Sequence, residues 1–224
     1  MKLLLHTCCA PCSVYCIKSL RAEGIEPTLF WYNPNIHPYA EYKARRDCLK
    51  KYAKVVGVDL ILKDSYGLDK FVCEVAKLGE DGMSSRCAEY CYPRRLREAF
   101  SYAASHGYDA VSTTLLYSIY QQHDIIRDLC SALAREFGVE FVYRDFREGW
   151  ALGQAEAREV GLYMQKYCGC VFSEEESFIG REISRDLRRA GVSPTNAEVR
   201  KVLEKAKAEG EIDLGEVKKA AKKG

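Results

Sequence analysis

Seven of the cysteines lie in three tight groups, and their spacing suits the chemistry of a soft metal or of redox-active thiols. In chain order, the groups are Cys8, Cys9 and Cys12, then Cys87 and Cys91, then Cys168 and Cys170. A soft metal needs several thiolates at about 2.3 Å from one point, and neighbouring residues bring sulfurs together at little cost in chain entropy. We therefore expect all seven thiols to be metal ligands.

The number of grouped thiols bears on the kind of centre. Structural zinc takes four ligands and an iron–sulfur cluster takes four thiolates, so seven exceed both requirements. The simplest hypothesis is one cluster plus a second site, or a cluster plus reactive thiols. Two zinc sites are the alternative, although the paired CxxC knuckles of zinc ribbons are absent from the sequence. The other cysteines stand alone and are expected to be inert: Cys16, Cys48, Cys73 and Cys130.

The composition is that of an ordinary globular protein. Hydrophobic residues make up 47% of the 224 residues and charged residues 29%, with a net charge of +2 that neither demands nor excludes nucleic acid. A chain of this length buries roughly 70% of its unfolded surface without disulfide staples. The first apolar run is too short for a signal peptide, and no segment approaches a membrane span. We expect a cytoplasmic protein, in which thiols stay reduced.

An alternation of strands and helices must position the thiols. Apolar and aromatic runs predict strands at residues 2–6, 28–32, 59–62, 109–113 and 140–143. Helical patterns fill residues 11–23, 39–56, 68–78, 88–105 and 122–137. Strands separated by helices predict an open α/β fold with a mostly parallel sheet flanked by helices.

The composition changes after Cys170, because every cysteine precedes that point. We expect a catalytic domain at residues 1–175 that carries all the cysteines, and a helical C-terminal extension at residues 176–224. Its helices are expected at 173–190 and 195–209, the second opened by Thr195 and Glu198 at capping-box spacing. A surface appendage is the simpler interpretation of this tail, and contact of its lysines with RNA is the alternative.

The first cysteine group directly follows the first expected strand, where ligands bind in open α/β sheets. The segment His-Thr-Cys-Cys-Ala-Pro-Cys has no glycine, so it is not a phosphate-binding loop. It is not the CxxxCxxC triplet of a radical enzyme either, because Tyr15 occupies the third position. Thiolate chemistry is the remaining prediction for this edge of the sheet.

Six segments in chain order resemble the QueH-type epoxyqueuosine reductases, and together they cover residues 1–175. They are His-Thr-Cys-Cys-Ala-Pro-Cys, Tyr-Asn-Pro-Asn-Ile-His-Pro, Arg-Cys-Ala-Glu-Tyr-Cys-Tyr, Ser-Thr-Thr-Leu-Leu-Tyr-Ser, Asp-Phe-Arg and Gln-Lys-Tyr-Cys-Gly-Cys. Each segment is weak evidence alone, whereas six in this order are specific.

The resemblance implies the last step of queuosine synthesis, in which epoxyqueuosine at the wobble position of a tRNA loses its epoxide oxygen. It implies a HUP-like (Rossmann-like) fold, a [4Fe–4S] cluster and a neighbouring second metal ion, expected to be iron. The expected partners are the tRNA anticodon stem-loop and an electron donor. Cys87 and Cys91 are the firmest cluster ligands, and the other five are not divided between the two centres.

Arginines and aromatic residues near the cysteines could contact an extruded base and its phosphates, although solvated charges and core tyrosines are the simpler interpretation. We expect substrate contacts from Asn33, Asn35, Arg86, Arg94, Tyr117, Gln121 and His123. No residue is assigned a catalytic role. Two other functions stay open: a zinc-stabilised tRNA- or nucleotide-binding module without redox chemistry, and a thiol–disulfide oxidoreductase using Cys9 and Cys12.

Overall fold

The computed structural model describes residues 1–79 and 85–189, together with 191, 195 and 199. The chain divides into two compact units, residues 1–165 and residues 166–224. The second unit begins before Cys168 and Cys170, whereas we expected an extension from residue 176. As a division between catalytic and accessory parts, the boundary at 175 stays a prediction.

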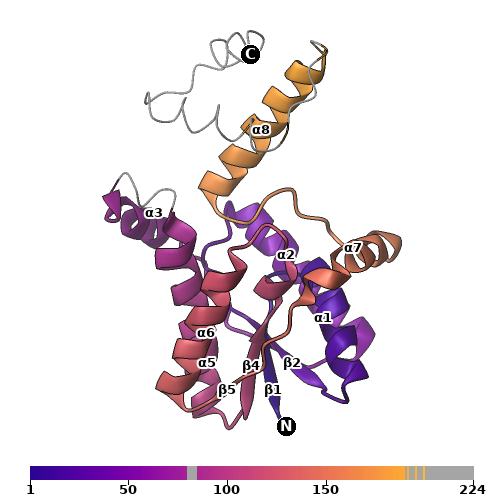
Figure 1. Cartoon of the computed structure of the whole chain (residues 1–224), viewed down its shortest axis with the longest axis vertical. Coiled ribbons are helices and arrows are strands. Elements are labelled where there is room, and N and C mark those ends of the chain that lie inside the picture. The colour runs from indigo at the N-terminus through magenta and orange to yellow at the C-terminus, as the bar shows by residue number, and fades with distance from the viewer. Residues whose placement is uncertain (80–84, 190, 192–194, 196–198, 200–224) are drawn as a thin grey trace. The chain divides into compact units, whose positions relative to one another are not determined.

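In the described part of the first unit, five parallel strands form one sheet in the order β3-β2-β1-β4-β5 (Figure 1). The strands are β1 (Leu3–His6), β2 (Pro27–Trp31), β3 (Leu60–Leu62), β4 (Ala110–Thr113) and β5 (Glu140–Phe141). The α/β fold and all five expected strands are confirmed. The strand order reverses beside β1, so the carboxyl ends of β1 and β4 border the usual ligand crevice of such sheets.

Helices connect and flank these strands. They are α1 (Ala10–Ala22), α2 (Tyr39–Val56), α3 (Leu68–Ala76), α5 (Tyr92–Ser105), α6 (His123–Phe137) and α7 (Trp150–Glu159). Gly57 and Gly138 end α2 and α6 in the left-handed conformation, with φ of 67° and 66°. The expected helices of this unit are confirmed within a few residues, whereas α7 was not expected.

One expected helix begins differently. Residues Cys87–Cys91 form a π-helical turn, η1, instead of the first turn of an α-helix, and the Tyr92 amide donates to the Cys87 carbonyl. Pro93 explains the change, because it has no N–H to offer and its ring crowds the carbonyl four residues earlier. The expected helix at 88–105 therefore begins as a π-helical turn and continues as α5 from Tyr92.

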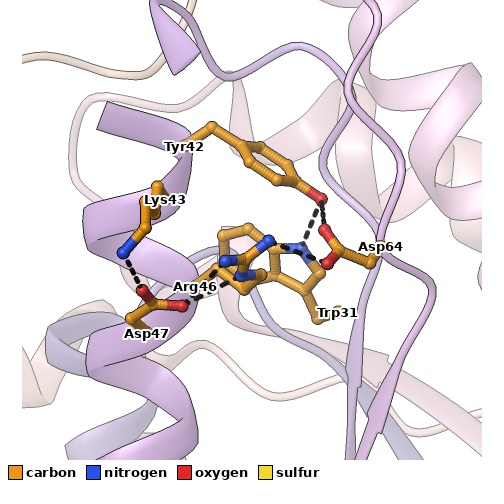
Figure 2. A network of polar contacts seen from close by, with 6 residues as sticks. All are labelled: Trp31, Tyr42, Lys43, Arg46, Asp47 and Asp64. Carbon is orange, nitrogen blue, oxygen red and sulfur yellow. Dashed lines mark hydrogen bonds and ion pairs between the residues drawn. The ribbon is translucent and has the colours of Figure 1, made fainter. Parts of the chain in front are cut away.

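A polar network attaches α2 to the sheet (Figure 2). Trp31 donates its indole N–H to the Tyr42 hydroxyl over 3.2 Å, and that hydroxyl donates to Asp64 over 2.7 Å. Arg46 binds Asp64 at 2.8 Å and Asp47 at 3.0 Å. Burial raises the pKa of Tyr42 to about 12. The charge of Arg46 is thus used inside the fold.

Two glycines bring α7 close to α1. A Cβ on Gly153 would lie 2.6 Å from the Tyr117 hydroxyl, and a Cβ on Gly149 would overlap the ring of Tyr15. The Tyr117 hydroxyl donates to the Trp150 carbonyl over 3.0 Å. Side chains at these two positions would force the helices apart.

The second unit contains α8 (Val171–Arg189), with Ile183 and Leu187 buried. The expected helix at 173–190 is confirmed. The second expected helix, residues 195–209, lies outside the described residues except at 195 and 199. Within the described chain, no helix is long and apolar enough to cross a bilayer.

Candidate metal centre

The turn between β1 and α1 brings three thiols together. The Sγ atoms of Cys8, Cys9 and Cys12, here called the thiol triplet, all lie within 4.8 Å of one another. Cys9 caps α1 in extended conformation, with φ of −171°, and its side chain makes no capping hydrogen bond. The helix end therefore directs its positive dipole at the triplet, which favours thiolates. Buried sulfurs in this arrangement fit a soft metal.

The three thiols of the triplet differ in pKa. Hydrogen bonds from Cys12 and Cys9 hold the pKa of Cys8 well below its usual value, with help from Arg95 and Thr114. Burial raises the pKa of Cys9, and the hydrogen bond to Cys8 raises that of Cys12. The Cys8 Sγ lies 3.8 Å from that of Cys9. The triplet thus holds one preferred thiolate, at Cys8.

A buried polar network borders the triplet. Arg95, on α5, is 3% exposed and donates from Nη2 to the Asn33 Oδ1 over 2.7 Å. Asn33 donates to the carbonyl of Thr7, next to Cys8, over 3.0 Å. Burial, then the charge of Arg95, lowers the pKa of His6 to about 3, so that its imidazole is neutral. Arg95 is thus a fixed positive charge beside the triplet, and the buried Arg45 acts on Cys9 in the same sense.

Gln165 reaches the same thiols from the end of the first unit. Its Nε2 donates to the Cys9 Sγ over 3.0 Å and lies 3.6 Å from the Cys12 Sγ. Its Oε1 is buried without a hydrogen-bond partner among the described residues. Two residues earlier, the Tyr163 hydroxyl donates to Glu41. These contacts hold the last residues of the first unit against the triplet and against α2.

The other cysteine groups lie on separate segments. Cys91 is buried, and Cys87 packs against the main hydrophobic core. In the second unit, Cys170 is buried and its Sγ accepts from the Ser173 amide over 3.4 Å, whereas Cys168 is exposed. The structure therefore assembles the thiol triplet, and the participation of all seven thiols in metal binding stays a prediction.

The isolated cysteines differ in environment. Cys16 and Cys130 are fully buried, Cys48 is partly buried and Cys73 is exposed. The Cys16 thiol donates to the Cys12 carbonyl over 3.2 Å, and burial raises the pKa of both buried thiols. These positions suit the inert roles expected for them.

Several expected substrate residues are engaged inside the protein. Asn33 uses both ends of its amide, and the buried Tyr117 is bonded to the α7 backbone. Gln121 accepts from the Tyr92 hydroxyl over 2.8 Å. His123 Nε2 lies 3.0 Å from the Tyr143 hydroxyl, and burial lowers its pKa.

The remaining three expected substrate residues differ in their exposure to solvent. Arg94 is exposed, with its guanidinium 5.8 Å from the centre of the Tyr32 ring. Arg86 is buried, as is Asn35, whose Oδ1 has no hydrogen-bond partner within the described chain. Substrate contact by all seven residues stays a prediction.

The sequence pattern does contain a signal for Arg95. On α5 the buried positions are Tyr92, Arg95, Leu96, Ala99, Phe100 and Ala103. Their helical spacing places Arg95 inside the apolar face, although composition alone groups it with the exposed arginines nearby. A cation inside an apolar face needs a specific partner, and Arg95 finds one in Asn33.

A comparison with known families shows the family of this chain. The family model described as epoxyqueuosine reductase QueH matches residues 3–176. This chain belongs to the QueH family. The resemblance expected from the six segments is confirmed.

Curated QueH proteins are similar over most of this chain. The relative from Dehalococcoides mccartyi is 38% identical over 177 residues, which are 79% of this chain and 94% of the relative. That from Haemophilus influenzae is 35% identical, over 81% and 75% of the two chains. That from Thermotoga maritima is 33% identical, over 76% and 88%. The QueH match includes all seven grouped cysteines and ends early in α8.

Proposed function

We propose that this protein is an epoxyqueuosine reductase acting on tRNA. The observation that carries the proposal is the thiol triplet at the carboxyl end of β1, in a chain that belongs to the QueH family. The reaction breaks both C–O bonds of the epoxide. Two electrons and two protons are consumed, a carbon–carbon double bond forms, and the oxygen leaves as water.

The proposed cofactors are a [4Fe–4S] cluster and a second metal ion, iron. The donor set fits both, since thiolates are the ligands that iron–sulfur clusters take. The proposed ligands are Cys8, Cys9, Cys12, Cys87, Cys91, Cys168 and Cys170. When bound, these groups would supply single electrons and a Lewis acid, which the side chains of the protein cannot supply.

The residues of the chain prepare the site for that chemistry. Arg95 offsets the negative charge that thiolates accumulate, and the Gln165 amide donates to one of the sulfurs. The burial of Cys9 and Cys12 keeps water from them. Substrate contacts are proposed for Asn33, Asn35, Arg86, Arg94, Tyr117, Gln121 and His123.

The proposed partners are the anticodon stem-loop of a tRNA and a one-electron donor protein or reductant. Because the grouped thiols stay reduced in the cytosol, we propose that the protein works in the cytoplasm.

The test is direct reduction under anaerobic conditions. Reconstituted protein is assayed for iron and sulfide, reduced, and incubated with tRNA that carries epoxyqueuosine. We expect the modified nucleoside to lose the mass of one oxygen atom. Cys8→Ser and Cys12→Ser should abolish the loss, whereas Cys73→Ser, which changes an exposed thiol, should not.

Two results would contradict the proposal. One is an unchanged nucleoside mass with fully loaded, reduced protein. The other is a colourless protein that binds only zinc and still binds tRNA, which would indicate the binding module instead.

A further inference from the structure

Helix α8 carries an exposed basic surface on one side. Arg181, Arg185, Arg188 and Arg189, here called the arginine face, line a groove of about 460 Å³ together with Ser184. All four arginines are exposed. Spacings of four, seven and eight residues place them on one side of a helix, away from the buried Ile183 and Leu187.

The arginine face is poorly neutralised by its own helix. Only Asp186 pairs with it among the described residues, at 3.7 Å from Arg185 and 3.9 Å from Arg189. Arginines of the first unit hold their carboxylates closer. Arg21–Glu26 and Arg46–Asp64 are both 2.8 Å, and Arg127–Asp124 is 2.9 Å. Arg181 Nη1 also donates to the Lys166 carbonyl over 3.2 Å, and the exposed guanidiniums keep further N–H groups available to an external anion.

The net charge of the sequence also differs between the part that the family model matches and the part that follows it. Residues 1–176, where the family match ends, contain 22 Lys and Arg against 24 Asp and Glu, a net charge of −2. Residues 177–224 contain 12 against 8, a net charge of +4. The part that the family model matches is thus slightly acidic, and the sequence beyond it carries the basic excess that favours binding to a polyanion.

We propose that the arginine face binds the sugar–phosphate backbone of tRNA. The choice of RNA rests on the proposed function. A guanidinium donates two parallel hydrogen bonds to a phosphate, and arginines one helical turn apart can follow successive phosphates. Contacts of this kind carry no sequence information, so they hold the substrate without reading its bases. The extension beyond the family match thereby increases the affinity of the enzyme for tRNA.

The experiment measures binding of an unmodified tRNA transcript to the full chain over a range of salt concentrations. The variant R181Q/R185Q/R188Q removes three charges from the face. The matched control K50Q/K51Q/K54Q removes three from exposed positions on α2. We expect the first variant to lose roughly ten- to a hundredfold in affinity, and its salt dependence to become shallower by about one unit of slope per lost phosphate contact.

A charge-preserving variant separates binding from folding. R181K/R185K/R188K should keep most of the affinity, and circular dichroism should show equal helix content in all variants. Equal binding by wild type and R181Q/R185Q/R188Q would overturn the inference, as would an equal loss in the α2 control. Unchanged tRNA binding with weaker use of an acidic electron donor would overturn it in favour of a protein partner. Because the transcript undergoes no reduction, a failure of the proposed reductase activity leaves this test unaffected.

Discussion

Arg95 Nη2 lies 2.7 Å from the Oδ1 of Asn33, and this bond links a buried cation on α5 to the turn that carries the thiol triplet. Within the described residues, Arg95 pairs with no carboxylate. A buried charge is costly unless an opposite charge compensates it. The thiolate of Cys8, whose pKa Arg95 helps to lower, is the compensating group that the structure offers.

Replacing Arg95 tests that relationship. In metal-free Arg95→Met protein, we expect the pKa of Cys8 to rise, because the positive charge near its thiolate is lost. Alkylation of Cys8 by iodoacetamide at neutral pH should then slow several-fold, as followed by peptide mass spectrometry. Arg95→Lys, which keeps the charge, should restore most of the rate. Superimposable pH profiles for wild type and Arg95→Met would refute this role.

Gln165 is expected to tune the reduction potential of a bound cluster. Its N–H donates to the Cys9 sulfur over 3.0 Å, and such bonds favour the more negative, reduced state. Gln165→Leu should lower the midpoint potential by roughly 20–60 mV, the equivalent of about 1 kcal/mol in a one-electron couple. Electrochemical titration measures it. Gln154→Leu, whose amide lies near Tyr117 instead, is the control; identical shifts in both variants would contradict the assignment.

The approach of α7 to α1 predicts a stability effect. Gly149→Ala should lower the free energy of unfolding by about 1–3 kcal/mol, because the new methyl group overlaps the Tyr15 ring. Gly67→Ala is the control, since its Cβ would lie 3.7 Å from the nearest atom. Urea unfolding compares the two. If Gly149→Ala is as stable as the control, the helices are not in the close contact described.

The burial of His37 leads us to expect a lower free energy of unfolding in mild acid. Burial lowers its pKa to about 4 from 6.5, and its ring packs 4.8 Å from that of Phe71. At a pH between about 4 and 6.5, His37 is protonated in the unfolded chain and neutral in the folded chain. Stability from this group therefore falls as the pH falls, by at most about 1.4 kcal/mol per pH unit. Urea unfolding at about pH 7.5, 6 and 5 should show a smaller decrease for His37→Phe. Parallel curves would exclude His37 as the source.

The regular elements could be predicted because their signals are local. Apolar runs identify the strands, and helical patterns identify α2 and α6, whose observed ends at Gly57 and Gly138 lie close to the expected ones. The position of Cys8 directly after β1 places the thiol triplet at the ligand-binding edge of the sheet. Each of these features can be predicted from residues that are close together in the sequence.

The rest of the site depends on contacts between distant residues. Gln165 meets Cys9 across 156 positions of the sequence, and Arg95 meets Asn33 across 62. Nothing local predicts either bond. The π-helical turn is an intermediate case, because Pro93 signals an irregular helix without specifying which irregularity forms.

The formation of the thiol triplet by a single turn has a consequence for the protein without its proposed cluster. Zinc fingers unfold when their metal leaves, because their few residues form no other core. Here the sulfurs sit on a sheet and helices with a large apolar core of their own. Loss of the proposed cluster would therefore leave the protein folded. Adding iron and sulfide to that folded protein would then be sufficient to restore the site.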